Sequence, residues 1–203
     1  PILMSAIAGI VQALWDIKGK HYDAPIHELL GGKVREKIRY YRWVGGDRPT
    51  DVGQNASTLV DRGVTAVKMN ATPEFERIET PKKIKQAGER LKTVRNAVGE
   101  DIKIGVDFHG RVAKSMAPRV AQELEPYDPM FFEEPVLPEH NDALSEITAT
   151  TTVPIATGER LFSRWDFKSI LEQNVVDVIQ PDPSHAGGVT EVTKIASMAE
   201  AYD

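Results

Sequence analysis

Apolar residues recur with a helical spacing near the start of the chain. Between residues 6 and 20 they lie three or four positions apart, which predicts a core helix with a buried apolar stripe. The residues of this stripe are Ile7, Ile10, Val11, Leu14 and Ile17. The glycine pair Gly31 and Gly32 then predicts the end of the helical segment.

From residue 37 onward, short apolar runs rich in β-branched residues alternate with helical patterns. This alternation is typical of βα units on a parallel sheet, so we expect an α/β fold. The predicted strands are 38–44, 64–70, 102–107, 130–133, 154–158 and 176–180, with helices at 82–98 and 116–124. Units of this length favour a (β/α)8 barrel, which six strands leave incomplete. An open doubly wound sheet is the alternative, although no strand precedes a dinucleotide-binding or phosphate-loop motif.

Composition narrows the class of protein. The 203 residues are 41% hydrophobic and 27% charged, as expected for a globular chain with a sizeable core. A net charge of -5 gives no basic field, so we expect neither nucleic acid nor anionic membrane as a partner. We find no long apolar run or leader, and no cysteine, so we expect no membrane span, no signal peptide and no disulfide. The cytoplasm is the expected compartment.

Acidic residues end four of the predicted strands: Asp107, Glu133, Glu159 and Asp182. They are separated by about one βα unit each, so successive strands deliver them to the same end of a barrel. Three neighbouring carboxylates form an oxygen-only site that repels itself unless a hard cation such as Mg²⁺ neutralises it. The alternative is that each carboxylate caps the helix that follows.

Three further side chains lie close to these strand ends in the sequence. His109 follows Asp107 by two positions, and along an extended strand it would share a face with that carboxylate, which suits a catalytic acid. By the same alternation Lys68 and Asn70 point to the barrel axis, where they would bind a substrate carboxylate and a hydroxyl. The alternatives are a structural histidine and a solvated lysine.

Four sequence strings resemble the mandelate racemase branch of the enolase superfamily. They are DFHGR at 107–111, FEEP at 132–135, GER at 158–160 and QPDPSHAGG at 180–188. The resemblance implies a (β/α)8 TIM-like barrel with an N-terminal capping domain. On that basis residues 1–36 are a helical segment that joins the cap to the barrel, and residues 37–203 are strands 1 to 6 of a partial barrel. The cap and the last barrel units are then missing from these 203 residues.

The resemblance also implies a reaction. It is the Mg²⁺-dependent dehydration of a sugar acid to a 2-keto-3-deoxy acid through an enediolate. D-galactonate is the favoured aldonic acid, with mannonate or gluconate as alternatives. Asp107, Glu133 and Glu159 would bind Mg²⁺, His109 would protonate the leaving hydroxyl, and Asp182 would orient a histidine base.

Two departures from the family pattern matter. The base histidine belongs to a seventh strand, beyond Asp203, so a catalytically inactive metal-binding fragment stays an alternative. Asn70 stands where racemases of this group carry a lysine, which favours dehydration over two-base racemisation. The remaining histidines fit no catalytic role, and the family analogy implies a homo-oligomer.

Overall fold

The computed structural model describes residues 1–46 and 49–202. Its strands form one sheet in the order β1-β2-β3-β4-β5-β6. Neighbouring strands from β1 to β5 pair in parallel. The strands are β1 Arg42–Trp43, β2 Ala66–Asn70, β3 Lys103–Asp107, β4 Phe131–Glu133, β5 Ile155–Thr157 and β6 Val178–Ile179. The predicted α/β class with a parallel sheet is therefore confirmed.

Each observed strand is shorter than its predicted run of apolar residues. The largest difference concerns the first run, 38–44, of which only Arg42–Trp43 forms a ladder, opposite Val67 and Lys68. An apolar run predicts the potential for strand structure, but a strand exists only where a neighbour supplies backbone partners.

Helices α1 to α8 are Ile2–Tyr22, Ile26–Leu29, Pro49–Val60, Pro81–Val98, Ala117–Leu124, Leu144–Thr148, Arg164–Glu172 and Val189–Ala199. Two 3-10 helices cover Glu125–Tyr127 and Pro138–Ala143. Local signals explain several of the ends. The Thr80 side chain accepts the N–H of Lys83 before α4, and Ser163 forms a capping box with Asp166 before α7.

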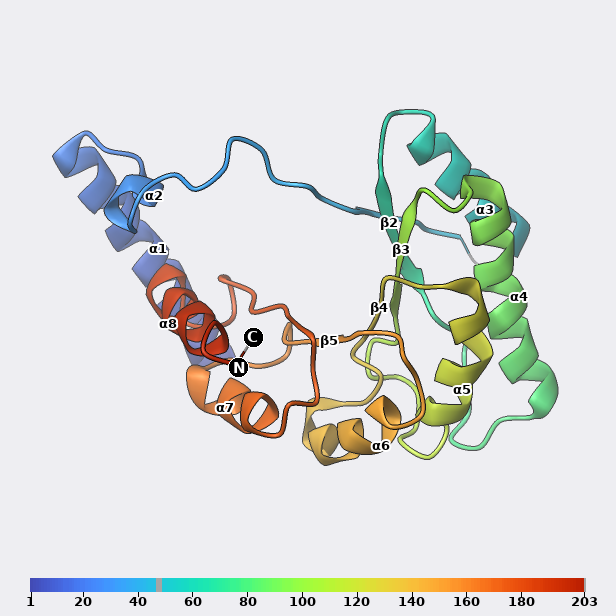
Figure 1. Cartoon of the computed structure of the whole chain (residues 1–203). Coiled ribbons are helices and arrows are strands. Elements are labelled where there is room, and N and C mark those ends of the chain that lie inside the picture. The colour runs from blue at the N-terminus through green and yellow to red at the C-terminus, as the bar shows by residue number, and fades with distance from the viewer. Residues whose placement is uncertain (47–48, 203) are drawn as a thin grey trace. The chain divides into compact units, whose positions relative to one another are not determined.

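The chain divides into two compact units. Unit 2 contains residues 40–156 and 175–178, and unit 1 contains residues 1–39, 157–174 and 179–203. Within unit 2, helices α3, α4 and α5 lie together on one side of β2, β3 and β4 (Figure 1). Val67, Met69 and Phe132 are fully buried. Alternation along the strands turns the intervening residues, among them Lys68 and Asp107, to the other face of the sheet.

Within unit 1, α1 packs against α8 and the loop before it. The Trp15 indole donates to Thr190 Oγ1 at 2.9 Å, and the Gln12 amide donates to the Pro183 carbonyl at 3.1 Å. Val11 lies so close to Gly188 that a Cβ there would come within 2.9 Å of it. The packed side of α1 thus carries small and polar residues.

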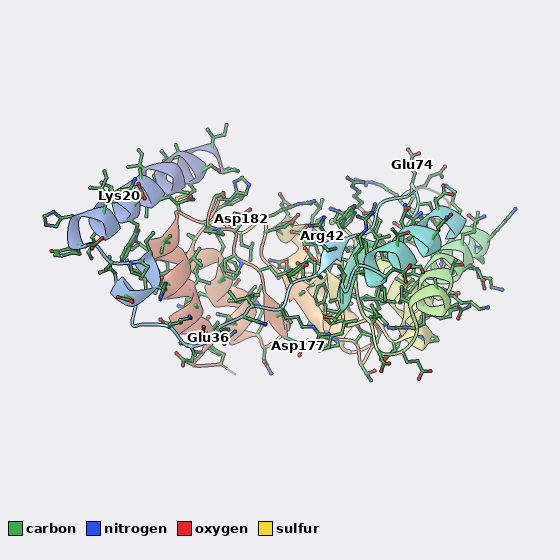
Figure 2. All side chains as sticks on the ribbon, turned by 90° about the horizontal axis from the view of Figure 1, so that it is seen from above. Lys20, Glu36, Arg42, Glu74, Asp177 and Asp182 are labelled. Atoms are coloured by element: carbon green, nitrogen blue, oxygen red, sulfur yellow. The ribbon has the colours of Figure 1, made fainter. Side chains whose placement is uncertain are left out.

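The predicted burial of the apolar stripe of α1 is wrong for Ile10, Leu14 and Ile17, whereas Val11 of the same stripe is half-buried. Ile10, Leu14 and Ile17 are 57% to 63% exposed, because the helix packs through the side that holds Ala8 and Val11. Many side chains of α1 project away from the ribbon (Figure 2). In length and composition α1 also passes as a membrane span, contrary to our expectation, although core helices and signal sequences pass the same test.

Glu125 accepts two hydrogen bonds from Thr152 within unit 2, from the hydroxyl at 2.5 Å and from the backbone N–H at 2.7 Å. These two hydrogen bonds lower the pKa of Glu125. We expect Glu125→Gln to lower the free energy of unfolding at neutral pH. The difference in free energy of unfolding between the two proteins is complete above the pKa of Glu125 in the unfolded chain, about 4.3. It disappears as the pH falls through the lower pKa of Glu125 in the folded protein. Urea unfolding of both proteins across this range measures it; parallel stability curves would contradict the expectation.

Candidate active site

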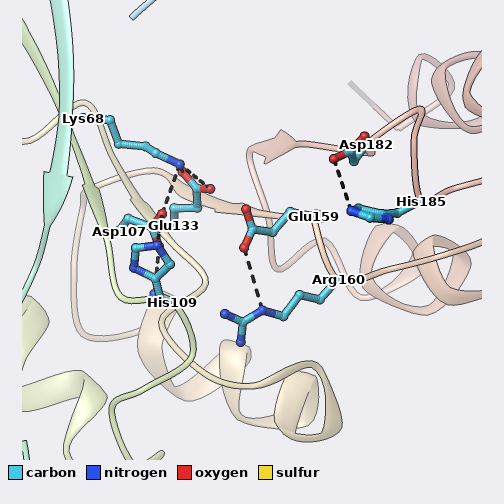
Figure 3. A network of polar contacts seen from close by, with 8 residues as sticks. All are labelled: Lys68, Asp107, His109, Glu133, Glu159, Arg160, Asp182 and His185. Carbon is cyan, nitrogen blue, oxygen red and sulfur yellow. Dashed lines mark hydrogen bonds and ion pairs between the residues drawn. The ribbon is translucent and has the colours of Figure 1, made fainter. Parts of the chain in front are cut away.

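Lys68 lies between two buried carboxylates at the ends of neighbouring strands in unit 2 (Figure 3). Asp107 and Glu133 are register partners across β3 and β4, so their side chains project from the same face. Each is 2% exposed. Lys68 Nζ is 2.8 Å from both carboxylate oxygens of Glu133 and 3.0 Å from Asp107 Oδ2. The site therefore holds one ammonium between two carboxylates.

The protonated state of Lys68 is strongly stabilised. Burial by itself lowers the pKa of this lysine, but the hydrogen bond to Glu133 and the charges of Asp107 and Glu133 outweigh burial and raise the pKa above its ordinary value. Gly105 provides the space, because a Cβ there would lie 2.8 Å from the Phe131 ring and 3.4 Å from Lys68 Cγ. The lysine therefore stays charged at neutral pH.

His109 reaches Asp107 through a turn. β3 ends at Asp107, and His109 and Gly110 both adopt left-handed backbone conformations, with φ of 52° and 60°. The His109 N–H donates to Asp107 Oδ1 at 2.7 Å, which holds the turn. His109 Nε2 then lies 3.4 Å from Asp107 Oδ2. The extended-strand geometry that we expected is wrong, yet the imidazole lies beside the carboxylate.

Aromatic side chains that sequence reasoning missed complete this face of the sheet. The Trp43 ring meets the His109 ring edge to face at 5.5 Å. Lys68 Nζ lies 5.7 Å from the Trp43 ring centroid and 5.5 Å from that of Tyr41, within the range of a cation–π contact. The sequence pattern could have identified both rings, because Tyr41 and Trp43 stand two positions apart in the predicted strand 38–44 and therefore share a face.

A cavity of about 630 Å³ opens beside this cluster within unit 2. Asn70, Asp107 and His109 line it together with Arg90 and Arg111. Arg90 is 5% exposed and donates to the Gly46 carbonyl. Of the predicted residues, Lys68, Asn70, Asp107, His109 and Glu133 thus belong to one region of unit 2.

Glu159 and Asp182 belong to unit 1, where they line a second cavity of about 530 Å³. Glu159 lies 3.7 Å from Arg160 Nε. Asp182 Oδ1 accepts the N–H of Ser184, and Asp182 Oδ2 lies 3.8 Å from His185 Nε2. The sequence analysis assigns no catalytic role to His185. The structure places it beside Asp182, which it follows by three positions. Figure 3 shows these side chains as sticks.

The described residues of unit 2 place two carboxylates of the kind that hard divalent cations prefer, with Lys68 Nζ between them. Asp107 Oδ2 is buried and forms no hydrogen bond within residues 1–46 and 49–202, although Lys68 Nζ is near. Two carboxylates against one ammonium leave a net negative charge, and oxygen is the ligand that Mg²⁺ prefers. In the described part of the chain, no group of three or more histidine, aspartate or glutamate side chains is placed so that it could hold a metal ion.

Two family models match the chain. Residues 51–203 match the model described as enolase C-terminal domain-like. Residues 2–31 match the model described as mandelate racemase / muconate lactonizing enzyme, N-terminal domain. The two matches leave Pro1 and residues 32–50 uncovered.

Relatives with known names are similar over the whole chain. The D-galactonate dehydratase of Ralstonia pickettii (strain 12J) is 54% identical over 203 residues, which are 100% of this chain and 53% of that protein. The solved structure of an enolase superfamily member from Salmonella Typhimurium has a TM-score of 0.94 at 33% sequence identity. The match covers 100% of this chain and 58% of the Salmonella chain. The 3,6-anhydro-D-galactonate cycloisomerase of Zobellia galactanivorans has a TM-score of 0.89 at 34% identity, with coverage of 100% and 55%. The chain thus spans about half the length of the curated relative that it matches.

Proposed function

The chain belongs to the mandelate racemase / muconate lactonizing enzyme family of the enolase superfamily, and from this premise we propose that it is part of an Mg²⁺-dependent sugar-acid dehydratase. D-galactonate is the proposed substrate. The observation that carries the proposal is the pair of buried, register-matched carboxylates Asp107 and Glu133, with His109 beside them.

Asp107 and Glu133 would hold the metal, with Glu159 of unit 1 as the third proposed ligand. Bound Mg²⁺ supplies Lewis-acid stabilisation of the negative charge that develops on the substrate carboxylate when the adjacent carbon loses its proton. The donor chemistry supports this assignment, because all three side chains offer hard carboxylate oxygens.

The protein's own groups perform the other roles in this proposal. Lys68 would bind the substrate carboxylate once a bound metal ion replaces its present pairing with Asp107 and Glu133. His109 protonates the departing hydroxyl, and its N–H bond to the Asp107 carboxylate fixes the turn that presents the imidazole. Asn70 lines the same cavity as His109 and would donate its amide to a sugar hydroxyl. Asp182 would orient the histidine base.

Substrate identity separates the proposal from its alternatives. A relative that is 54% identical to this chain is named for D-galactonate, whereas a structural neighbour is named for the cycloisomerisation of an anhydro sugar acid. A protein of the relatives' full length should therefore be incubated with galactonate, mannonate, gluconate and 3,6-anhydrogalactonate. We expect a 2-keto-3-deoxy acid from galactonate; turnover of mannonate or gluconate but not galactonate would refute the assignment.

Mg²⁺ binding tests the metal assignment on the 203-residue chain directly. We expect calorimetric titration of the parent to detect binding, and Glu133→Gln to weaken it by roughly tenfold or more, because one charged oxygen ligand is lost. The exposed Glu139→Gln has the same change in charge and serves as the control. A parent chain that binds no Mg²⁺, or a Glu139→Gln protein that loses as much affinity, would contradict the assignment.

A further inference from the structure

A basic hollow adjoins the cavity that contains Asn70 and His109. It measures about 690 Å³ and is formed by the loops that follow β2, β3 and β4 of unit 2. Phe75 and Arg111 line both spaces. The two are therefore contiguous, with Arg111 at the boundary.

Positive charge dominates the lining of the basic hollow. Arg77, Arg111 and Lys114 contribute three cations and His140 an imidazole, whereas Glu76 is the acidic residue among the described lining side chains. The chain as a whole carries a net charge of -5. A general excess of basic residues therefore does not explain this cluster, which gathers side chains from three separate loops.

The three cations have no protein partner that would explain their position. Within residues 1–46 and 49–202, the side chains of Arg77, Arg111 and Lys114 form no ion pair and no hydrogen bond. All three line the basic hollow and are exposed. Three cations and one carboxylate around the same hollow leave a net positive charge, which an oxyanion would neutralise through charge-assisted hydrogen bonds.

We infer that the basic hollow is a second binding site, which takes an oxyanion of the carboxylate or phosphate class. Guanidinium groups match such anions in geometry, since they donate in parallel to two oxygens. The anion comes either from a free inorganic ion or from the far end of a ligand that also occupies the adjoining cavity. The second source alone rests on the proposed function, because it requires a sugar acid bound near Asp107.

Inorganic phosphate is the first probe, and the 203-residue chain is titrated without added metal. We expect measurable binding that Arg77→Gln and Lys114→Gln each weaken by about tenfold, the usual effect of losing one charge-assisted hydrogen bond. The control is Arg62→Gln, because Arg62 is exposed in the turn that precedes β2, at the opposite end of the strands. Absence of phosphate binding by the parent, or equal weakening in the control, would overturn the inference.

A pair of sugar acids distinguishes the two sources. Displacement of phosphate by an aldaric acid, with carboxylates at both ends, at a much lower concentration than the matching aldonic acid requires assigns the basic hollow to the far end of a diacid. Equal displacement by the two acids assigns it to a single free oxyanion. Displacement by neither assigns it to a free inorganic ion. Because the measurement is binding without metal or turnover, a failed dehydratase assay would leave this result intact.

Discussion

Replacing Lys68 by methionine is expected to lower the free energy of unfolding by about 3 kcal/mol, because two buried carboxylates lose their shared cation. Lys68 Nζ lies within 3.0 Å of both Asp107 and Glu133, each only 2% exposed. Their mutual repulsion is then uncompensated at low dielectric. Urea unfolding in the presence of a chelator measures this loss.

Added Mg²⁺ is expected to restore part of the lost stability of the Lys68→Met protein. A divalent cation bound by the same carboxylates replaces the missing charge, and binding to the folded state stabilises it by mass action. Lys92→Met provides the control, since Lys92 forms an exposed pair with Glu89 at 3.5 Å and such pairs contribute about 0 to 1 kcal/mol. Equal stability of the parent and the Lys68→Met protein would show that the charge cluster does not hold unit 2 together.

Local patterns predicted the parallel α/β layout well, for a physical reason. The alternation of Val67 and Met69 with Lys68 and Asn70 reports which face of β2 meets the helices, and period-two burial is a local property. The burial of the apolar stripe on α1 could not be predicted in the same way. Burial of Ile10 or Leu14 depends on what packs against the helix, and the helix pattern specifies only a suitable face.

The acidic members of the candidate site could be identified from strand ends, but their mutual geometry could not. Sequence spacing placed Asp107 and Glu133 one βα unit apart, and the register of β3 and β4 then makes them neighbours. The approach of His109 depends on two left-handed residues and a carboxylate–amide hydrogen bond. Lys68 pairs with Glu133 instead of a substrate carboxylate. This pairing depends on how β2, β3 and β4 pack, so the sequence of a single strand does not predict it.

Gly158 is the position at which an added methyl group should damage unit 1 most. Its φ of 144° is unfavourable for other residues, and a Cβ there would lie 2.8 Å from the Gln180 nitrogen and 3.0 Å from the Phe167 ring. The Gln180 N–H donates to the Thr157 carbonyl at 2.9 Å, and Phe167 is fully buried. Neither neighbour can yield without breaking a backbone hydrogen bond or disturbing the core.

We expect Gly158→Ala to lower the free energy of unfolding by roughly 2 to 5 kcal/mol, from backbone strain and overpacking together. Gly9→Ala is the matched control, because Gly9 lies within α1 with open space around its Cα and alanine favours a helix by about 0.5 to 1 kcal/mol. Thermal unfolding of both proteins measures the contrast, and equal shifts would contradict the expectation.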